Sequence, residues 1–179
     1  KKIVDDINAT GGKAIGLAGN KNNLIEAKKL NMDFKDSDSN IEKILDLGFV
    51  GKPTQIATNI VNESIAKGFI PVIAPLGIDK EGNTYNINAD TVAGAIAEAM
   101  KADKLLLLTD VAGILDQGDK LISSLSIVEA KKIIHEKYVA GGMKPKISTC
   151  INAIDQGVKQ ATILDGRIPH SLILELFTE

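Results

Sequence analysis

The sequence of 179 residues predicts an α/β protein with three αβα layers, in which helices cover both sides of an open, mostly parallel central sheet. Two observations predict this class. Segments with a strand pattern alternate along the chain with segments of helical periodicity, which implies crossover connections between parallel strands. In addition, the run Lys104–Thr109 contains four successive leucines, which is typical of a strand buried on both faces of a parallel sheet.

The chain opens with a predicted helix and a predicted strand. Residues 1–9 form the helix, because their apolar residues recur at i, i+1 and i+4. Gly11 and Gly12 end that helix, and residues 13–18 follow as a short buried strand.

A hairpin, a helix and a strand are predicted next. Residues 24–30 and 46–50 are the arms of the hairpin, and the polar, turn-rich residues 33–40 between them predict an exposed loop. Pro53 fits the first turn of the following helix, because proline is tolerated there. Residues 69–74 are an apolar strand, and the proline inside it indicates that one edge of the strand is unpaired.

The second half of the chain continues the alternation and is read from the same two periodicities. Its predicted elements are a strand over 84–88, a helix from Asp90 to Met100, a strand over 104–109, helices near 126–137 and 142–156, a strand over 160–164 and a helix over 170–177.

Composition excludes several classes of protein. Lys and Arg number 21 against 23 Asp and Glu, a net charge of −2, which argues against a nucleic-acid groove and a polybasic membrane segment. One cysteine rules out an intrachain disulfide framework, and no apolar run reaches the length of a membrane span. We therefore expect a soluble, cytoplasmic protein.

The first candidate site is the corner between a strand and a helix at residues 85–90. Alternation along the strand places Asn86 and Asn88 on one side, with Asp90 at the start of the helix. Capping is the alternative, since Asn88 or Asp90 would satisfy free helix amides.

The second candidate site is the loop after the leucine strand. Asp110 follows the strand directly, where ligands of parallel sheets bind, and it could hold a ribose hydroxyl. Gly113 would let backbone approach such a ligand. A plain turn remains the alternative.

The third candidate site opens the helix at 142–156. Gly141 and Gly142 allow close approach of an anion to free helix amides. Lys146, about one turn further, could reach a transferring phosphoryl group, and a solvated surface lysine is the alternative. His135 and His170 lack a clear third metal ligand and are expected to be structural, as is Cys150 inside the helix.

Several motifs occur together at compatible spacing, which makes them more specific than any one alone. They are Tyr85-Asn-Ile-Asn-Ala-Asp90, Leu107-Leu-Thr-Asp110-Val-Ala-Gly113, Gly141-Gly-Met-Lys-Pro-Lys146, Asp165-Gly-Arg-Ile-Pro-His170 and, earlier in the chain, Gly11-Gly-Lys-Ala-Ile-Gly-Leu17 and Leu47-Gly-Phe-Val-Gly51. In these motifs the chain resembles the amino acid kinase family along nearly its whole length. Within the family the resemblance is to members that phosphorylate N-acetyl-L-glutamate in arginine biosynthesis.

The resemblance implies a reaction and a set of roles. ATP, carried with Mg²⁺, would phosphorylate the γ-carboxylate of N-acetyl-L-glutamate to an acyl phosphate. Lys146 would stabilise the phosphoryl group and Asp90 would orient the catalytic lysines, while Asn86 and Asn88 would bind the amino acid. No general base is needed, because a carboxylate is already a nucleophile. The nucleotide would be bordered by Asp110, Val111, Gly113, Leu115, Tyr138 and Gly142.

The resemblance also implies that the chain is a fragment whose N-terminal part is incomplete. The family's Lys-x-Gly-Gly strand, its Gly-Gly-Gly loop and its closing Gly-x-Gly-Thr segment do not occur here. Residues 1–102 would be the rest of the domain that binds the amino acid and dimerises, and residues 103–179 the ATP-binding domain. The 179 residues alone are expected to be inactive or very weak.

Two rival functions remain. One is a kinase of the same family that acts on aminoadipate on a carrier protein, and the other is a non-catalytic nucleotide-binding or regulatory domain. The ending Leu174–Thr178 looks like that of arginine-inhibited members, with Glu175 as the guanidinium partner of an arginine effector. The family also implies a homo-oligomer, at least a dimer.

Overall fold

The computed structural model describes residues 1–35, 42–139 and 141–177. Its backbone divides into two compact units, Lys1–Val92 and Ala93–Glu179. Within the described ranges no helix is both long and apolar enough to cross a membrane. The two units are taken in turn.

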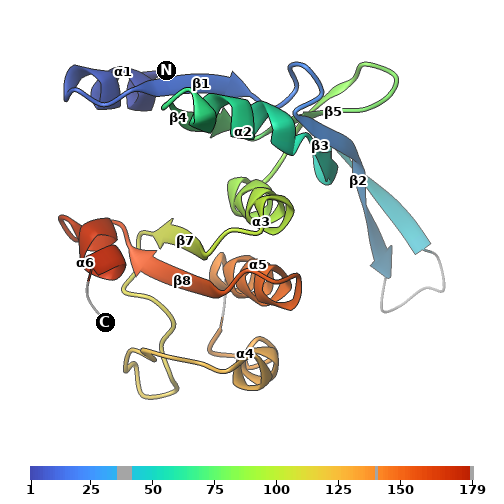
Figure 1. Ribbon diagram of the computed structural model, residues 1–179. Coiled ribbons are helices and arrows are strands. Elements are labelled where there is room, and N and C mark those ends of the chain that lie inside the picture. Colours follow the sequence, from blue (N-terminus) through green and yellow to red (C-terminus); the bar gives the residue numbers. More distant parts are fainter. Residues whose placement is uncertain (36–41, 140, 178–179) are drawn as a thin grey trace. The chain divides into compact units, whose positions relative to one another are not determined.

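One part of the N-terminal unit consists of two helices and a pair of parallel strands (Figure 1). Helix α1 (Lys2–Ala9) leads into β1 (Ala14–Ala18), and helix α2 (Thr58–Ala66) leads into β4 (Ile70–Ala74). The strands β1 and β4 run parallel, with Ala14 opposite Ile70 and Ile15 opposite Pro71. They form a two-stranded sheet among the described strands, which accommodates Pro71 at an edge as predicted.

The other four strands of this unit close into a small ring. In order around it they are β2 (Ile25–Lys35), β3 (Glu42–Ile56), β6 (Thr84–Asn86) and β5 (Leu76–Ile78). The predicted hairpin arms are confirmed as β2 and β3, which pair antiparallel over a longer span than expected. The ring itself was not part of the prediction, because its closure joins strands that are distant in sequence.

Two local predictions in this region are wrong. Pro53 lies in β3, opposite Ala27, and the helix starts only at Thr58. Proline fits there because the ladder is irregular at that point: the register shifts between Glu26 and Ala27. The predicted loop begins too early, since residues 33–35 still belong to β2, and residues 36–40 lie outside the described ranges.

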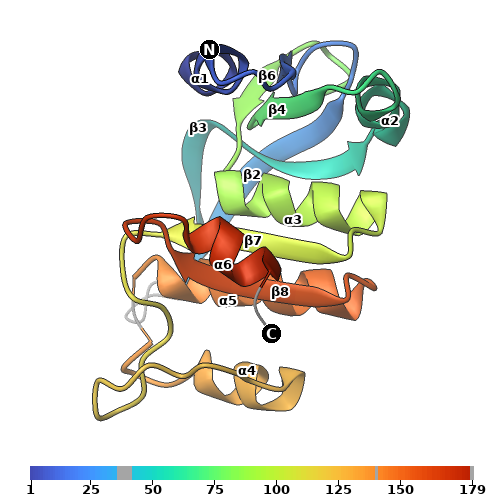
Figure 2. The same cartoon turned by 60° about the vertical axis from the view of Figure 1, so that its left-hand side comes forward.

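Helix α3 (Ala89–Met100) leads into the C-terminal unit, whose centre is a parallel pair of strands. Strand β7 (Lys104–Thr109) and strand β8 (Gln160–Asp165) pair in register, with Thr109 opposite Asp165 (Figure 2). Helix α5 (Met143–Asp155) covers one face, where an apolar core joins it to the strands and to α3. The buried residues of this core are Ala97, Leu105, Leu107, Ala153 and Val158.

Helix α6 (Ser171–Phe177) covers the other face of β8. Alternation along β8 explains both neighbours, because Ala161 and Ile163 pack toward the core while Thr162 donates a hydrogen bond to Glu175 of α6 at 2.9 Å. Helices therefore lie on both faces of a parallel pair, and the predicted α/β class with parallel pairing is confirmed. The leucine strand is less buried than predicted: Leu108 is 45% exposed.

The short helix α4 (Ile127–Ile133) completes the unit. Its start follows from local sequence, since Ser126 and Glu129 form a capping box in which each side chain accepts a hydrogen bond from the other's backbone N–H. An ion pair from Lys131 to Asp155, 2.8 Å long, ties α4 to α5. Behind it, a second apolar cluster of Val139, Ile147 and Ile151 anchors the start of α5.

Candidate functional site

The end of β7 and the start of α5 meet at the carboxyl edge of the parallel pair. Lys146, in the first part of α5, donates a hydrogen bond from Nζ to the carbonyl oxygen of Leu108 over 3.4 Å. Its neighbour in sequence, Ile147, is only 2% exposed, so the helix is fixed at this point by its core. The lysine cation is thereby held at the strand edge where ligands of such sheets bind.

Two glycines precede α5 and leave its first turn open. Gly141 has a φ of +56°, which favours glycine, whereas Gly142 has an ordinary φ of −67°. A Cβ atom on either glycine would meet no heavy atom within 4 Å. Gly142, the N-cap residue, has no side chain to cap the helix, and a helix N-terminus of this kind favours an anion.

The loop after β7 is folded back on itself. Asp116 accepts hydrogen bonds on Oδ1 from the backbone N–H groups of Gly118 and Lys120 at 2.7 and 3.0 Å. Leu115 forms a β-bridge with Leu121 across this turn. Gly113 has a φ of +137°, a conformation that requires glycine, whereas the Leu121 Cδ1 atom 2.8 Å from a Cβ there ends an exposed side chain that can move aside.

The residues predicted to border the nucleotide all lie in the C-terminal unit. Ile114, within the loop, and Tyr138 both pack against the Val139–Ile147–Ile151 cluster that also anchors α5. Asp110 and Val111 are exposed at the start of the loop, Val111 by 44%. Asp110 therefore follows the end of β7 directly, and Ile114 and Tyr138 share an apolar cluster with the helix that carries Lys146.

Asp165 and Arg167 were quoted among the family motifs, but sequence reasoning gave them no role at the site. Asp165, at the end of β8, has a side chain only 8% exposed and pairs with an Arg167 side chain that is 63% exposed. Its carboxylate accepts hydrogen bonds from Arg167 Nε, Nη2 and backbone N–H at 2.9, 2.7 and 2.9 Å. These hydrogen bonds from the Arg167 side chain and backbone lower the pKa of Asp165 to about 2. Asp165 and Arg167 are two residues apart in an irregular turn, so no periodic pattern in the sequence indicated their contact.

The predicted amino-acid residues lie in the N-terminal unit. Tyr85 and Ile87 are buried, at 6% and 2% exposure, whereas Asn86 and Asn88 are exposed, so the predicted alternation is confirmed. Asn88 also caps α3, because its Oδ1 accepts a hydrogen bond from the Thr91 backbone N–H at 3.1 Å. Asp90 follows in the first turn of that helix and is half-buried.

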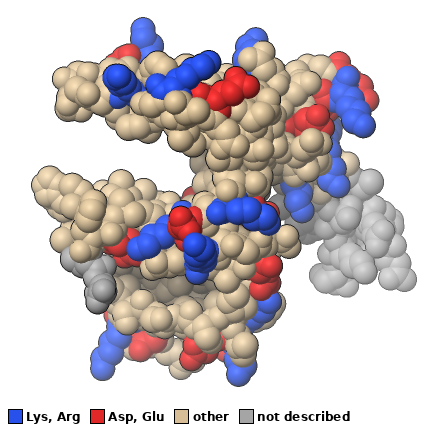
Figure 3. All heavy atoms as spheres, viewed as in Figure 1, with Lys and Arg blue, Asp and Glu red and all other residues tan. Residues whose placement is uncertain are grey.

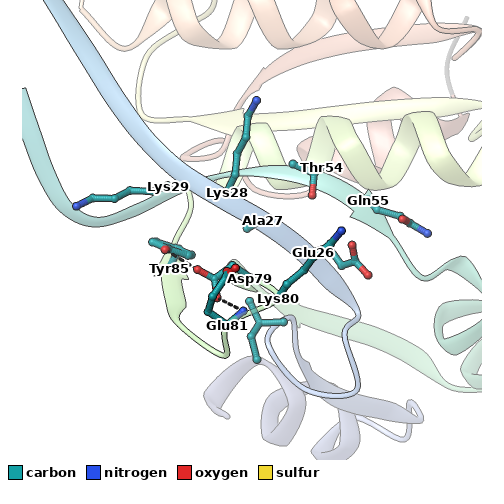
Figure 4. A pocket seen from close by; sticks show the side chains of 11 residues that line it. Glu26, Ala27, Lys28, Lys29, Thr54, Gln55, Asp79, Lys80, Glu81 and Tyr85 are labelled. Atoms are coloured by element: carbon teal, nitrogen blue, oxygen red, sulfur yellow. Dashed lines mark hydrogen bonds between the residues drawn. The ribbon is translucent and has the colours of Figure 1, made fainter. Parts of the chain in front are cut away.

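A pocket in the same unit lies on the other side of this strand (Figure 4). It encloses about 570 Å³ and is lined by β2, β3 and the turn before β6. Asp79 is occupied by its own turn, accepting from the backbone N–H groups of Glu81 and Asn83 and from the Tyr85 hydroxyl at 2.7 Å. The hydrogen bond to Asp79 raises the pKa of Tyr85. The remaining charged side chains are of both signs, which specifies no ligand charge. The full lining is Glu26, Ala27, Lys28, Lys29, Thr54, Gln55, Ile78, Asp79, Lys80, Glu81 and Tyr85.

Glu175 is engaged inside the C-terminal unit. Its Oε1 accepts hydrogen bonds from Thr162 Oγ1 at 2.9 Å and from Gln160 Nε2 at 3.2 Å. An arginine ligand would have to share this carboxylate with β8.

Charged side chains of both signs are dispersed over the face shown in Figure 3, where Lys and Arg alternate with Asp and Glu.

Comparison with known proteins identifies the family. Residues 1–165 match the Amino acid kinase family. The chain belongs to that family. The membership accounts for the parallel strands with helices on both faces, and it agrees with the fold similarity to Giardia carbamate kinase, which has a TM-score of 0.67 at 14% identity over 96% of this chain and 62% of that one.

Curated members of the amino acid kinase family are similar over nearly the whole chain. An acetylglutamate kinase of Afipia carboxidovorans is 52% identical over 178 residues, which are 99% of this chain and 60% of that protein. One from Rhodospirillum centenum is 53% identical over 179 residues, 100% of this chain and 59% of that protein. The chain thus spans about 60% of the length of the curated relatives it matches.

Solved structures of relatives add the fold of other members. N-acetylglutamate synthase of Neisseria gonorrhoeae, solved with coenzyme A and L-arginine, has a TM-score of 0.74 and 25% identity over 93% of this chain and 36% of that one. The protein smu.665 of Streptococcus mutans has a TM-score of 0.75 and 30% identity over 90% of this chain and 60% of that one.

Proposed function

We propose that the protein, at its natural length, transfers the γ-phosphoryl group of ATP to the γ-carboxylate of N-acetyl-L-glutamate. The observation that carries the proposal is the position of Lys146, held by a hydrogen bond to Leu108 at the end of β7. The name and the 51–53% identity of the curated relatives support the choice of substrate. ATP would enter with Mg²⁺ as its complex.

The C-terminal unit supplies the residues proposed for ATP. The open first turn of α5, entered through Gly142, would receive phosphate oxygens on backbone N–H groups. Lys146 would neutralise negative charge on the γ-phosphoryl group during its transfer. The protein itself would form no covalent bond to that group. Asp110 would accept hydrogen bonds from the ribose, and Val111, Gly113, Leu115 and Tyr138 would border the nucleoside.

The N-terminal unit supplies the residues proposed for the amino acid. Asn86 would donate its amide to the substrate near the α-carboxylate, and Asn88 would stand beside it while capping α3. Asp90 would orient cationic groups toward the phosphates, since the attacking carboxylate needs no base.

Metal, effector, assembly and location are proposed on the family alone. In the described ranges no three His, Cys, Asp or Glu side chains cluster as a metal site. Mg²⁺ would therefore be held chiefly by the phosphates of ATP, as this ion often is. Arginine is proposed as an effector at Glu175, supported by the arginine complex of the related synthase. We also propose a cytoplasmic homo-oligomer, with residues 1–102 serving the amino acid and 103–179 serving ATP.

Steady-state kinetics of the protein at its natural length test the proposal. ADP release should depend on N-acetyl-L-glutamate, and Lys146→Ala should lower kcat by a factor of about 100 to 1,000 with a small change in either KM. The matched control is Lys144→Ala, an exposed lysine in the same turn. Equal activity of the Lys146 and control variants would refute the role of Lys146, and ADP release that depends instead on an aminoadipate carrier would refute the substrate. Nucleotide binding without any transfer would leave a non-catalytic domain.

A further inference from the structure

Helices α3 and α5 approach each other closely at a glycine. Gly94 of α3 is buried, and a Cβ atom there would lie 2.6 Å from the Cγ2 methyl of Thr149 on α5, whereas ordinary van der Waals contact begins at 3.4 Å. Thr149 branches at Cβ, and rotation of such a side chain is restricted in a helix, so the methyl cannot simply swing aside. The absence of a side chain at Gly94 therefore sets the distance between the two helices.

The C-terminal ends of the same two helices are tied together. Lys101, directly after α3, donates a hydrogen bond from Nζ to the carbonyl oxygen of Gln156, directly after α5, at 3.0 Å. Each helix leads through a short connection into one of the parallel strands β7 and β8, so the helices run in the same direction. Because the ends are tied, a displacement at the Gly94–Thr149 contact moves the start of α5 more than its end.

Lys146 lies at the start of α5, three residues before Thr149. With the rise of an α-helix, Thr149 is about 10 Å and Lys146 about 15 Å from Gln156. Widening the contact from 2.6 to 3.4 Å moves Thr149 by about 0.8 Å, which corresponds to about 1.1 Å at Lys146. The hydrogen bond from Lys146 Nζ to the Leu108 carbonyl oxygen is already 3.4 Å long, so a shift of this size is enough to break it.

We propose that Gly94 is a positioning residue for phosphoryl transfer, because its close contact with Thr149 holds α5 where Lys146 reaches the end of β7. The inference rests on the proposed function, in which Lys146 neutralises charge on the γ-phosphoryl group. It gives a glycine on the neighbouring helix a role in the rate of transfer. A misplacement of about 1 Å in the reacting geometry can lower a rate by a factor of about 100.

Steady-state kinetics of the protein at its natural length test the inference. Gly94→Ala should lower kcat about tenfold or more, with a small change in either KM. Thr149→Ser removes the opposing methyl, so Gly94→Ala combined with Thr149→Ser should restore kcat to within about twofold of the unsubstituted protein. In the Lys146→Ala background, Gly94→Ala should change kcat less than about twofold, because the lysine that it positions is gone.

Ala97→Gly is the matched control. Ala97 is 7% exposed and lies one turn further along α3, in the apolar core that α3 shares with α5. Removal of its methyl group costs stability, and glycine also lowers helix propensity, but nothing presses the helices apart. The control should lower the thermal midpoint and leave kcat within about twofold of the unsubstituted protein, which separates an effect of position from one of stability.

The opposite results would overturn the inference. Unchanged kcat in Gly94→Ala, or an equal loss with and without Lys146, would show that Gly94 does not act through that lysine. A loss that Thr149→Ser does not restore would show that the contact with Thr149 is not the cause. If Gly94→Ala does not fold, Thr149→Ile, which enlarges the other partner of the contact, takes its place with the same expected loss.

The proposed function fails by a different result. If the unsubstituted protein released no ADP in dependence on N-acetyl-L-glutamate, that function would be overturned and the inference with it. A normal rate in the unsubstituted protein with no loss in Gly94→Ala would overturn the inference alone.

Discussion

Replacement of Ile147 measures how firmly the core holds the helix that carries Lys146. Ile147 is 2% exposed and lies with Val139 and Ile151 in a buried cluster. Ile147→Val removes one carbon and should lower the free energy of unfolding by about 1 kcal/mol. Ile147→Ala removes three, which is about 2.4 kcal/mol of transfer free energy, and the cavity left behind should bring the loss to about 3–4 kcal/mol.

Chemical denaturation followed by far-UV circular dichroism is the assay, since the chain has no tryptophan to report by fluorescence. Val128→Ala is the control, because Val128 is 63% exposed on neighbouring α4 and its truncation should cost less than about 0.5 kcal/mol. Alanine raises helix propensity at both positions, so this gain does not separate the two variants. If Ile147→Ala cost no more than Val128→Ala, the start of α5 would not be anchored as described.

Two further predictions concern acid stability and close packing. The pKa of Asp165 falls to about 2 from an ordinary 3.8, so the contribution of its ion pair to the free energy of unfolding is fully present above about pH 4 and is lost as pH falls toward 2. Arg167→Met should therefore raise the pH midpoint of acid unfolding, measured by circular dichroism. The rise should be larger than that for Lys159→Met, which removes an exposed ion pair with Asp103. An unchanged midpoint would contradict the clamp. A Cβ on Gly19 would lie 2.1 Å from the Leu76 carbonyl oxygen, whereas one on Gly16 would lie 3.6 Å from Val4 Cγ2, so Gly19→Ala should cost about 1–3 kcal/mol by urea denaturation and Gly16→Ala much less. Equal stabilities of these two variants would show that the approach of β5 to Gly19 is looser than described.

Local patterns predicted most elements because they depend on neighbours in sequence. The leucine run and the glycines before α5 each act within one turn or one strand, and each is where the pattern placed it. Pro53 shows the limit of such signals. Proline fits the first turn of a helix and an irregular strand edge equally well, and only the pairing of β3 with β2 decided between them.

The candidate site divides along the same line. Alternation sufficed to place Asn86 and Asn88 on one side of a strand, because side chains of successive residues point to opposite faces. It could not predict that Lys146 reaches Leu108, since that contact joins a helix to a strand far away in the chain. Nor could it predict the clamp of Asp165 by Arg167, which depends on a turn without periodicity.

The sequence by itself determined the α/β class and the order of most helices and strands, because these follow from periodicity and local residue chemistry. The family came from the resemblance of its motifs to those of amino acid kinases. Only the tertiary structure decided the closed ring of β2, β3, β6 and β5, the exposure of Leu108, and the convergence of Lys146 and the Asp165–Arg167 turn on the end of β7. Each of these features depends on which distant segments pair and on the space left between them. The free energy that decides such pairing comes from the packing of the whole unit, so no short window of sequence can predict it.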